Sequence, residues 1–170
     1  PQKVKAFVGV DLGIVQIATT SEGEHFTGER VEKVRQRFNR TRKNLQRRGT
    51  KSARRILKRI GCREARFRAH ENHVIAKQIV ARAKDTSQGI AVEELTGIRS
   101  RCTVRYSQRN RHSGWAFAQL RAFVEYKARL AGVTVVAVDP RNSSRTCSAC
   151  GHCAKANRKS QGEFVCRHCG

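Results

Sequence analysis

Two cysteine pairs near the C-terminus constrain this chain more than any other feature. Cys147-x-x-Cys150 and Cys166-x-x-Cys169 are separated by fifteen residues. A Cys-x-x-Cys turn directs two thiolates toward one metal ion, and two such turns complete the tetrahedral sulfur shell that Zn²⁺ prefers in structural sites. The spacing therefore predicts a zinc ribbon with these four cysteines as ligands. Two disulfides are the alternative, but they fit poorly with the scattered positions of the other cysteines.

The pairing of the cysteines has an alternative register. Cys153 follows Cys150 at the same interval that separates Cys150 from Cys147. We favour Cys147 with Cys150, because Gly151 suits the turn after this pair and the other register would leave Cys147 unused. Two histidines inside the turns are further candidate ligands: His152 and His168. We interpret three cysteines outside the set as ordinary thiols: Cys62, Cys102 and Cys153.

Composition indicates a polyanionic partner. The 170 residues carry 36 Lys and Arg against 13 Asp and Glu, a formal net charge of +23, and 38% of them are hydrophobic. That length suffices for one domain with a core and a small appended module. No stretch approaches the ~20 apolar residues of a membrane span, so we expect a soluble protein. Nucleic acid is the expected partner, because phosphate contacts release counterions. A basic membrane-surface protein is the alternative, but no amphipathic helix carries aromatic anchors.

The positive charge is concentrated in one helical segment. Residues 30–84 contain twenty Lys or Arg and three acids. Apolar residues recur there at steps of three, four and seven, which is typical of helices. With Gly49 and Gly61 as breaks, we predict helices over residues 29–46, 51–60 and 63–83. Like charges at this density destabilise a free helix, so we expect a phosphate backbone to act as their counterion.

Strand patterns flank the basic helices. We predict strands over residues 5–10, 16–20, 24–27 and 89–92 and a further buried strand over 133–138. A helix is expected over residues 115–130, after a basic loop over 99–113. This order is that of an RNase H-like domain, an α/β fold with a mixed sheet flanked by helices. We predict a domain over residues 1–142, with a basic helical insertion at about 29–84, and a zinc ribbon over 143–170.

Two acids stand at strand ends. Asp11 ends the first strand and Glu93 ends the strand after the helices. A carboxylate at the tip of a central strand is costly unless a cation meets it, and oxygen ligands suit Mg²⁺ or Mn²⁺. Such ions clamp the attacking and leaving oxygens of a phosphodiester. The alternative is an ordinary turn acid. Asp139 before Pro140 could be a third ligand or a turn initiator, and Glu94 is expected to be a surface charge.

A succession of motifs runs along the chain. The motifs are Gly9-Val10-Asp11-Leu12-Gly13, Arg63-Glu64-Ala65-Arg66-Phe67-Arg68, Asn72-His73, Val92-Glu93-Glu94-Leu95, Gly114-Trp115, Glu125-Tyr126-Lys127, Val138-Asp139-Pro140-Arg141 and Cys147-Ser148-Ala149-Cys150-Gly151-His152. This succession resembles the RuvC nuclease and zinc-ribbon half of the TnpB (OrfB) family, the accessory proteins of insertion sequences and relatives of type V CRISPR effectors. The resemblance implies an RNA-guided, metal-dependent DNA endonuclease of a prokaryotic cytoplasm, associated with the nucleoid. It implies that Asp11 and Glu93 are the first two acids of the RuvC triad and that DNA and guide RNA are the partners.

The chain also departs from the family pattern. The third acid of the triad normally lies beyond the last cysteine pair, and a nucleic-acid-recognition region normally precedes the first strand. We therefore expect a fragment that binds nucleic acid, cleaves poorly, and exposes a sheet face through which it could dimerise. Ser143-Ser144 stands where relatives usually have Thr-Ser. Two other functions remain open: a nuclease-dead, guide-directed DNA binder and a non-enzymatic zinc-ribbon protein that binds RNA.

Overall fold

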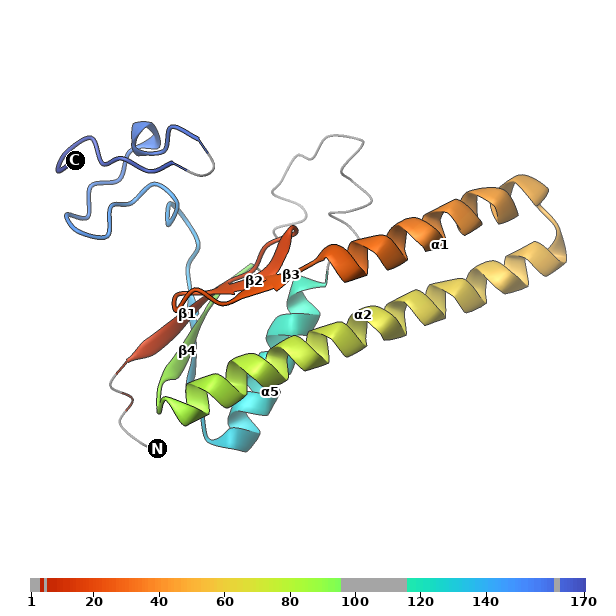
Figure 1. Ribbon diagram of the computed structural model, residues 1–170, viewed down its shortest axis with the longest axis horizontal. Coiled ribbons are helices and arrows are strands. Elements are labelled where there is room, and N and C mark those ends of the chain that lie inside the picture. The colour runs from red at the N-terminus through yellow and green to blue at the C-terminus, as the bar shows by residue number, and fades with distance from the viewer. Residues whose placement is uncertain (1–3, 5, 96–115, 161–162) are drawn as a thin grey trace. The chain divides into compact units, whose positions relative to one another are not determined.

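The protein forms two compact units, Pro1–Ala137 and Val138–Gly170. A computed structural model describes residues 4, 6–95, 116–160 and 163–170. The first unit is a mixed sheet with helices against it (Figure 1), so the predicted α/β fold class is confirmed. The expected loop over residues 99–113 and the motif Gly114-Trp115 lie outside the described residues. The assignment of residues 1–142 and 143–170 to separate functional domains stays a prediction.

In the described part of the chain, five strands form the sheet in the order β3-β2-β1-β4-β5. The β1–β2 and β2–β3 pairs are antiparallel, whereas β1 and β4 are parallel. A parallel pair needs a long crossover, which the basic helices between β3 and β4 supply. The strands are β1 (Phe7–Asp11), β2 (Gln16–Thr20), β3 (His25–Thr27), β4 (Gly89–Glu93) and β5 (Val135–Val138).

Alternation along β1 and β4 separates two faces of the sheet. Val8 and Val10 of β1 and Ile90 and Val92 of β4 are buried and belong to the hydrophobic core. They pack with apolar residues of α2 (Lys51–Asp85) and α5 (Phe117–Ala131), which include Ile75, Ile79, Leu120 and Val124. Because side chains alternate along a strand, the residues between and after these valines face the other side of the sheet.

A tight connection joins the two long helices. α1 (Glu29–Arg48) ends at Gly49, which has a left-handed φ of 65° and donates its N–H to the Leu45 carbonyl over 3.3 Å. Glycine adopts this conformation without the steric cost that a Cβ imposes. Thr50 then caps α2, because its hydroxyl accepts the Ala53 N–H over 3.1 Å. The first predicted helix and the turn that follows it are confirmed.

The predicted break at Gly61 is wrong, because α2 runs without interruption from Lys51 to Asp85. A glycine inside a helix costs about 0.5–1 kcal/mol relative to alanine. Packing on both sides of the glycine outweighs that cost. Ile60 is buried in the α1–α2 hairpin, and Ile75 and Ile79 are buried against the sheet.

We predict that Gly61→Ala stabilises the protein by about 0.5–1 kcal/mol, because alanine restricts the unfolded chain and favours the helix. A Cβ at Gly61 would meet no atom within 4 Å. Urea unfolding followed by circular dichroism at 222 nm measures the change. Gly49→Ala is the matched control and should destabilise, because Gly49 has φ +65°. A loss of stability in Gly61→Ala would contradict a continuous α2.

The expectation that residues 133–138 form a buried strand is wrong in part. β5 begins at Val135, and its last three residues are exposed. The exposed fractions of Val136 and Val138 are 37% and 47%. Among the described residues, the strand lies at the edge of the sheet and pairs with one neighbour, β4. The apolar run of the sequence could not show this, because a buried central strand and an exposed edge strand can have the same composition.

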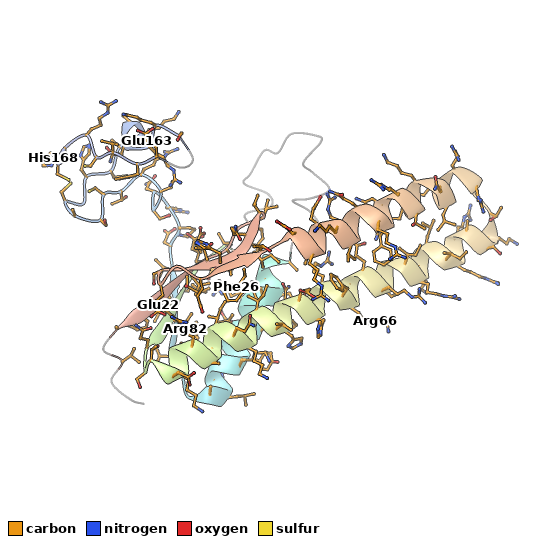
Figure 2. The ribbon with its side chains drawn as sticks, viewed as in Figure 1. Glu22, Phe26, Arg66, Arg82, Glu163 and His168 are labelled. Atoms are coloured by element: carbon orange, nitrogen blue, oxygen red, sulfur yellow. The ribbon has the colours of Figure 1, made fainter. Side chains whose placement is uncertain are left out.

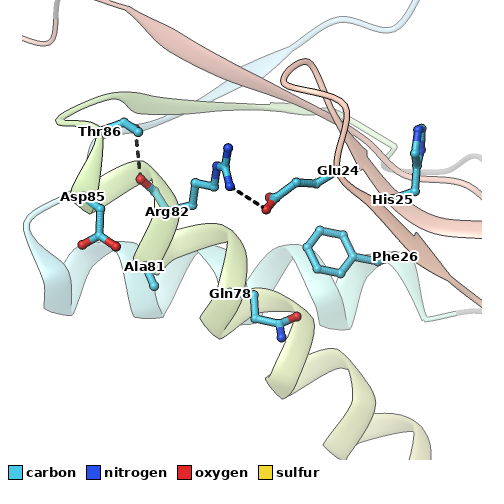
Figure 3. A pocket seen from close by; sticks show the side chains of 8 residues that line it. All are labelled: Glu24, His25, Phe26, Gln78, Ala81, Arg82, Asp85 and Thr86. Atoms are coloured by element: carbon cyan, nitrogen blue, oxygen red, sulfur yellow. Dashed lines mark hydrogen bonds and ion pairs between the residues drawn. The ribbon is translucent and has the colours of Figure 1, made fainter.

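An arginine of α2 ties the helix to the β2–β3 hairpin. Arg82 Nε lies 2.8 Å from Glu22 Oε2, and its Nη1 lies 3.0 Å from Glu24 Oε1. Figure 3 shows Arg82 reaching from α2 toward Glu24 across a groove of about 650 Å³, with Phe26 beside it. The hydrogen bond to Glu22 and the charges of Glu24 and Glu22 raise the pKa of Arg82 above its usual value. These contacts fix the hairpin over the end of α2.

Candidate functional site

The ends of β1 and β4 bring two acids together. Val10 is paired with Val92 in the parallel register, so the next residues in the two strands are Asp11 and Glu93. Both follow a buried valine, and their side chains therefore lie on the face of the sheet opposite the packed helices. Asp11 and Glu93 are in hydrogen-bond contact through their side chains. The parallel register thus places Asp11 and Glu93 at neighbouring strand ends, and their role as metal ligands stays a prediction.

The contact changes the proton affinity of one acid. Burial, the negative charge of Asp11 and the hydrogen bond to Asp11 together raise the pKa of Glu93 from 4.5 to about 7. A carboxyl pair of this kind shares a proton, because two adjacent anions repel each other. A divalent cation would remove the repulsion and bind to both oxygens. The donor set, two carboxylates and no nitrogen or sulfur, fits Mg²⁺ or Mn²⁺.

Other predicted acids take structural roles. Asp139 Oδ1 accepts the Arg141 N–H over 2.9 Å, and its side chain is 67% exposed, as expected of a turn initiator. Glu94 forms an ion pair with Arg121, which also binds Glu125. Among the described residues, the one group of three or more potential metal ligands is the cysteine cluster. In that part of the chain, therefore, Asp11 and Glu93 have no third ligand beside them.

The four predicted cysteines meet in the second unit. Their Sγ atoms all lie within 4.8 Å of one another and could hold a metal ion. Two Sγ–Sγ distances, Cys147 to Cys169 and Cys150 to Cys166, are 3.6 Å. A tetrahedral zinc site with Zn–S bonds of about 2.3 Å places its sulfurs about 3.8 Å apart. The spacing of the thiols therefore fits zinc. The cluster contains Cys147 together with Cys150, which is the register that the sequence favoured.

Backbone donors prepare two of these thiols for a metal. The N–H groups of Cys150 and Ala149 lower the pKa of Cys147 to about 6. The N–H groups of Cys169 and His168 lower the pKa of Cys166. Hydrogen bonds to Cys150, Cys147 and Cys166 raise the pKa of Cys169 to about 12. Four thiolates crowded without a cation would repel one another, and a bound Zn²⁺ removes this conflict.

An asparagine that the sequence analysis did not single out joins the two cysteine turns. Asn157 is fully buried, and its Nδ2 donates to the carbonyls of Arg145 and His152 over 2.9 and 3.0 Å. Its Oδ1 accepts the Arg167 N–H over 3.0 Å. One side chain thus connects the segment of the first pair with that of the second. No local pattern identifies this role, because the partners are backbone groups on both sides of Asn157 that meet it only when the two turns close.

The remaining candidates lie outside the cluster. Cys153 and Cys62 are exposed thiols, and Cys102 lies outside the described residues. His152 and His168 stack on each other with ring centroids 5.6 Å apart and are not members of the cluster. His73 stacks on Phe123 with ring centroids 3.8 Å apart and contacts the Tyr126 hydroxyl, so it packs between α2 and α5. No helix in the described part of the chain has the length and hydrophobicity of a membrane span.

Comparison with protein families shows which family the chain belongs to. A family model described as a probable transposase, OrfB_IS605, matches residues 1–98, which is more than half of the chain. The chain belongs to the OrfB family of probable transposases. A second model, the Cas12f1-like TNB domain, matches residues 117–170. The resemblance to TnpB/OrfB proteins given by the sequence motifs is confirmed.

Relatives of this OrfB family member include CRISPR-associated proteins. The CRISPR-associated endodeoxyribonuclease Cas12f1 of Syntrophomonas palmitatica is 29% identical over 187 residues, covering 100% of the chain and 36% of the relative. A TnpB-like protein of Methanocaldococcus jannaschii is 26% identical over 144 residues, covering 82% of the chain and 51% of the relative. The chain thus spans about a third to a half of the length of these relatives.

A solved structure shares the fold. The structure of a Cas12f1-sgRNA-target DNA complex contains a chain that matches with a TM-score of 0.68 and 18% identity, covering 90% of the OrfB family member and 41% of that chain. At this identity the likeness concerns the fold. Most of the OrfB family member thus shares its fold with part of a chain in that complex.

Proposed function

We propose that this OrfB family member is the nuclease portion of an RNA-guided DNA endonuclease, in which Asp11 and Glu93 bind divalent cations. The observation that carries the proposal is the contact between these acids on the neighbouring ends of β1 and β4. A relative is named an endodeoxyribonuclease, and the fold recurs in a complex with sgRNA and target DNA. Guide RNA and target DNA are the partners that this proposal implies.

In this proposal both carboxylates bind the metal ion, and Glu93 also gives up a proton when the ion binds. Asp11 and Glu93 would supply oxygen ligands from adjacent strands, so the sheet fixes their separation before the ion arrives. Mg²⁺ or Mn²⁺, when bound, would polarise a phosphodiester and generate a nucleophilic hydroxide at neutral pH. The raised pKa of Glu93 means that cation binding releases a proton near neutrality.

Cleavage by the 170-residue chain is proposed to be weak. Among the described residues no third carboxylate lies beside Asp11 and Glu93. Mg²⁺ needs several well-placed ligands and dehydrates reluctantly, so two carboxylates hold it loosely. Dimerisation through an exposed sheet face stays a prediction, as does association with the nucleoid.

The cysteine cluster is proposed to hold one structural Zn²⁺, with all four positions of the metal occupied by thiolates. A closed shell of this kind leaves no open position for substrate. The proposed zinc site thus organises the second unit and takes no direct part in phosphodiester cleavage. A non-enzymatic zinc-ribbon protein that binds RNA would have no use for the contact between Asp11 and Glu93, so this contact favours the nuclease proposal.

Mn²⁺ binding and DNA cleavage by the purified chain test the proposal. We expect wild-type protein to bind Mn²⁺ with a Kd of roughly 0.1–1 mM, as few-ligand oxygen sites do, and Asp11→Asn to bind at least tenfold more weakly. Electron paramagnetic resonance of free Mn²⁺ measures both. Cleavage of duplex DNA in Mg²⁺ should be slow and lost in Asp11→Asn. Equal Mn²⁺ affinity in the two proteins would reject the site, and efficient cleavage would reject the impairment.

A further inference from the structure

The two acids of the proposed metal site are held in different ways. Asp11 lies within the antiparallel ladder, because it is paired with Thr19 of β2. The parallel pairs between β1 and β4 end at Val10 and Val92, so Glu93 lies one residue beyond the last of them. The contact of Glu93 with Asp11 therefore depends on what holds the chain at the end of β4.

The two residues after Glu93 tie this strand end to the packed face of the sheet. Glu94 forms an ion pair with Arg121 of α5, and Leu95 packs against the hydrophobic core. Because side chains alternate along an extended chain, Glu94 reaches α5 on the packed face while Glu93 stays on the opposite face. The ion pair of Glu94 thus restrains the backbone next to Glu93 without occupying the site.

Arg121 is itself fixed by a second acid. Its Nε donates to Glu125 Oε1 over 2.7 Å, one helical turn further along α5, while its Nη1 pairs with Glu94. The side chain of Arg121 is 22% exposed, so it is largely shielded from water. The hydrogen bond to Glu94 raises the pKa of Arg121 above its usual value, and the guanidinium stays charged. A guanidinium that binds two carboxylates through separate nitrogens cannot easily turn away from Glu94.

The charge of Arg121 cannot be its contribution to a cation site. A guanidinium near the strand end repels Mg²⁺ or Mn²⁺, and this repulsion alone would weaken metal binding. The two acidic partners offset it, since one cation and two acids leave a formal charge of −1. Any benefit of Arg121 to metal binding must therefore come from the position that it gives to the end of β4.

We propose that Arg121 is a positioning residue for the metal site: through Glu94 it holds the end of β4 so that Glu93 stays beside Asp11. This inference rests on the proposed function, because the metal site belongs to that function. Arg121 supplies no ligand and acts through its neighbours. Glu94 and Glu125, two motif acids that the proposed cleavage does not use, thereby have a role in holding the arginine and the strand together.

Mn²⁺ binding to the purified chain in about 0.5 M KCl tests the proposal, because this salt screens charges that lie farther apart than roughly 5 Å. Electron paramagnetic resonance of free Mn²⁺ gives the Kd, and only binding that Asp11→Asn removes is counted. Arg121→Met keeps a long apolar stem and removes both hydrogen bonds. It should weaken Mn²⁺ binding about fivefold to tenfold, since outer-shell partners of a metal site are commonly worth 10–100-fold in affinity and Arg121 acts one residue away. Charge alone predicts the opposite, an equal or tighter affinity.

A second variant and a double variant separate position from charge. Glu94→Met should weaken Mn²⁺ binding about as much as Arg121→Met, and it tests the proposal even where Arg121→Met does not fold. The double variant removes one charge of each sign. If the pair acts as a unit, the double variant should bind within about twofold of Arg121→Met. A product of the two separate losses, on the order of 25-fold or more, would mean that the residues act independently and would overturn the proposal.

Arg82→Met and Arg129→Met are the matched controls. Arg82 also ties a helix to the sheet through two acids, and Figure 2 shows it close to Glu22, one of these acids. Arg129 is an exposed cation of α5, the helix that carries Arg121. Both controls should bind Mn²⁺ within about twofold of wild type. Circular dichroism at 222 nm shows whether each variant keeps its helices.

The outcomes distinguish this inference from the proposed function. A folded Arg121→Met protein that binds Mn²⁺ as tightly as wild type, or more tightly, would overturn the positioning role alone. Equal losses in Arg121→Met and Arg82→Met would also overturn it, because they would reflect general loosening of the fold. Mn²⁺ binding that Asp11→Asn leaves unchanged would reject the metal site and the positioning role together.

Discussion

Cys166→Ser is expected to unfold the unit Val138–Gly170 and to leave Pro1–Ala137 folded. Three residues of this unit are buried among those described, and two of them are the cysteines Cys147 and Cys166. Asn157 is the third, so an apolar core is absent from the described part of the unit. Domains below ~40 residues commonly need a metal or disulfides to fold. Structural zinc supplies about 10–16 kcal/mol in comparable peptides, and that energy is folding energy.

Metal analysis and NMR measure the outcome. Wild-type protein should contain one zinc ion per chain, and Cys166→Ser should contain less than about a tenth of that, because a three-thiolate shell is incomplete. The backbone amide of Arg167, which is bonded to Asn157 in the folded unit, should lose its dispersed chemical shift. Far-UV circular dichroism should change little, since the long helices belong to Pro1–Ala137.

Cys153→Ser is the matched control. Cys153 is an exposed thiol outside the cluster, so its removal should preserve both the zinc content and the amide spectrum. Loss of zinc in Cys153→Ser together with its retention in Cys147→Ser would instead support the register that pairs Cys150 with Cys153. Retention of a folded second unit after complete zinc removal would contradict a structural metal.

Local sequence patterns predicted where the strands, helices and metal ligands lie better than they predicted which of these elements are buried. The spacing of Cys147, Cys150, Cys166 and Cys169 identified the cluster, because a metal shell imposes a fixed interval on its ligands. The strand ends at Asp11 and Glu93 were readable because an acid after a buried strand is costly. The exposure of β5 was not readable, because it depends on which elements cover the strand.

Contacts between separate segments of the chain account for the features that local sequence patterns did not predict. α2 passes through Gly61 because Ile60 and the residues beyond it pack against other elements. The pairing of Arg42 with Glu64 depends on the register of two helices, and the hydrogen bonds of Asn157 depend on the closing of two turns. Arg42 and Glu64 are 22 residues apart, and Asn157 is 12 residues from Arg145, separations that neither hydrophobic periodicity nor residue preference encodes.

Glu93→Gln is expected to stabilise the metal-free protein at pH 8 and to remove its response to Mn²⁺. The folded state raises the pKa of Glu93 to about 7 from 4.5, so it holds the proton more tightly than the unfolded chain does. The stabilising contribution of the protonated acid is complete below pH 4.5 and is lost as the pH rises to 7. Because the side chain is partly exposed, we expect a loss of about 1–2 kcal/mol after solvent screening.

Urea unfolding at pH 5 and pH 8 measures this difference in buffers freed of divalent ions by resin, which leaves tightly bound zinc in place. The comparison is between wild type and Glu93→Gln, so other titrating groups cancel. The variant should gain about 1–2 kcal/mol on wild type between pH 5 and pH 8. Glu29→Gln, at a helix position whose side chain is 76% exposed, should show no such gain.

Adding Mn²⁺ at pH 8 separates a metal site from a strained acid pair. Mn²⁺ at ten times its Kd should stabilise wild-type protein by about 1.4 kcal/mol, because the ion binds the folded state alone. Glu93→Gln should gain less than about a third of that, since one anionic ligand is missing. An unchanged pH profile in Glu93→Gln would contradict the raised pKa. If Glu93→Gln changes the pH dependence of stability as expected but Mn²⁺ stabilises both proteins equally, the ion binds elsewhere. The repulsion between Asp11 and Glu93 in the metal-free protein is thus the property that a cation would convert into binding energy.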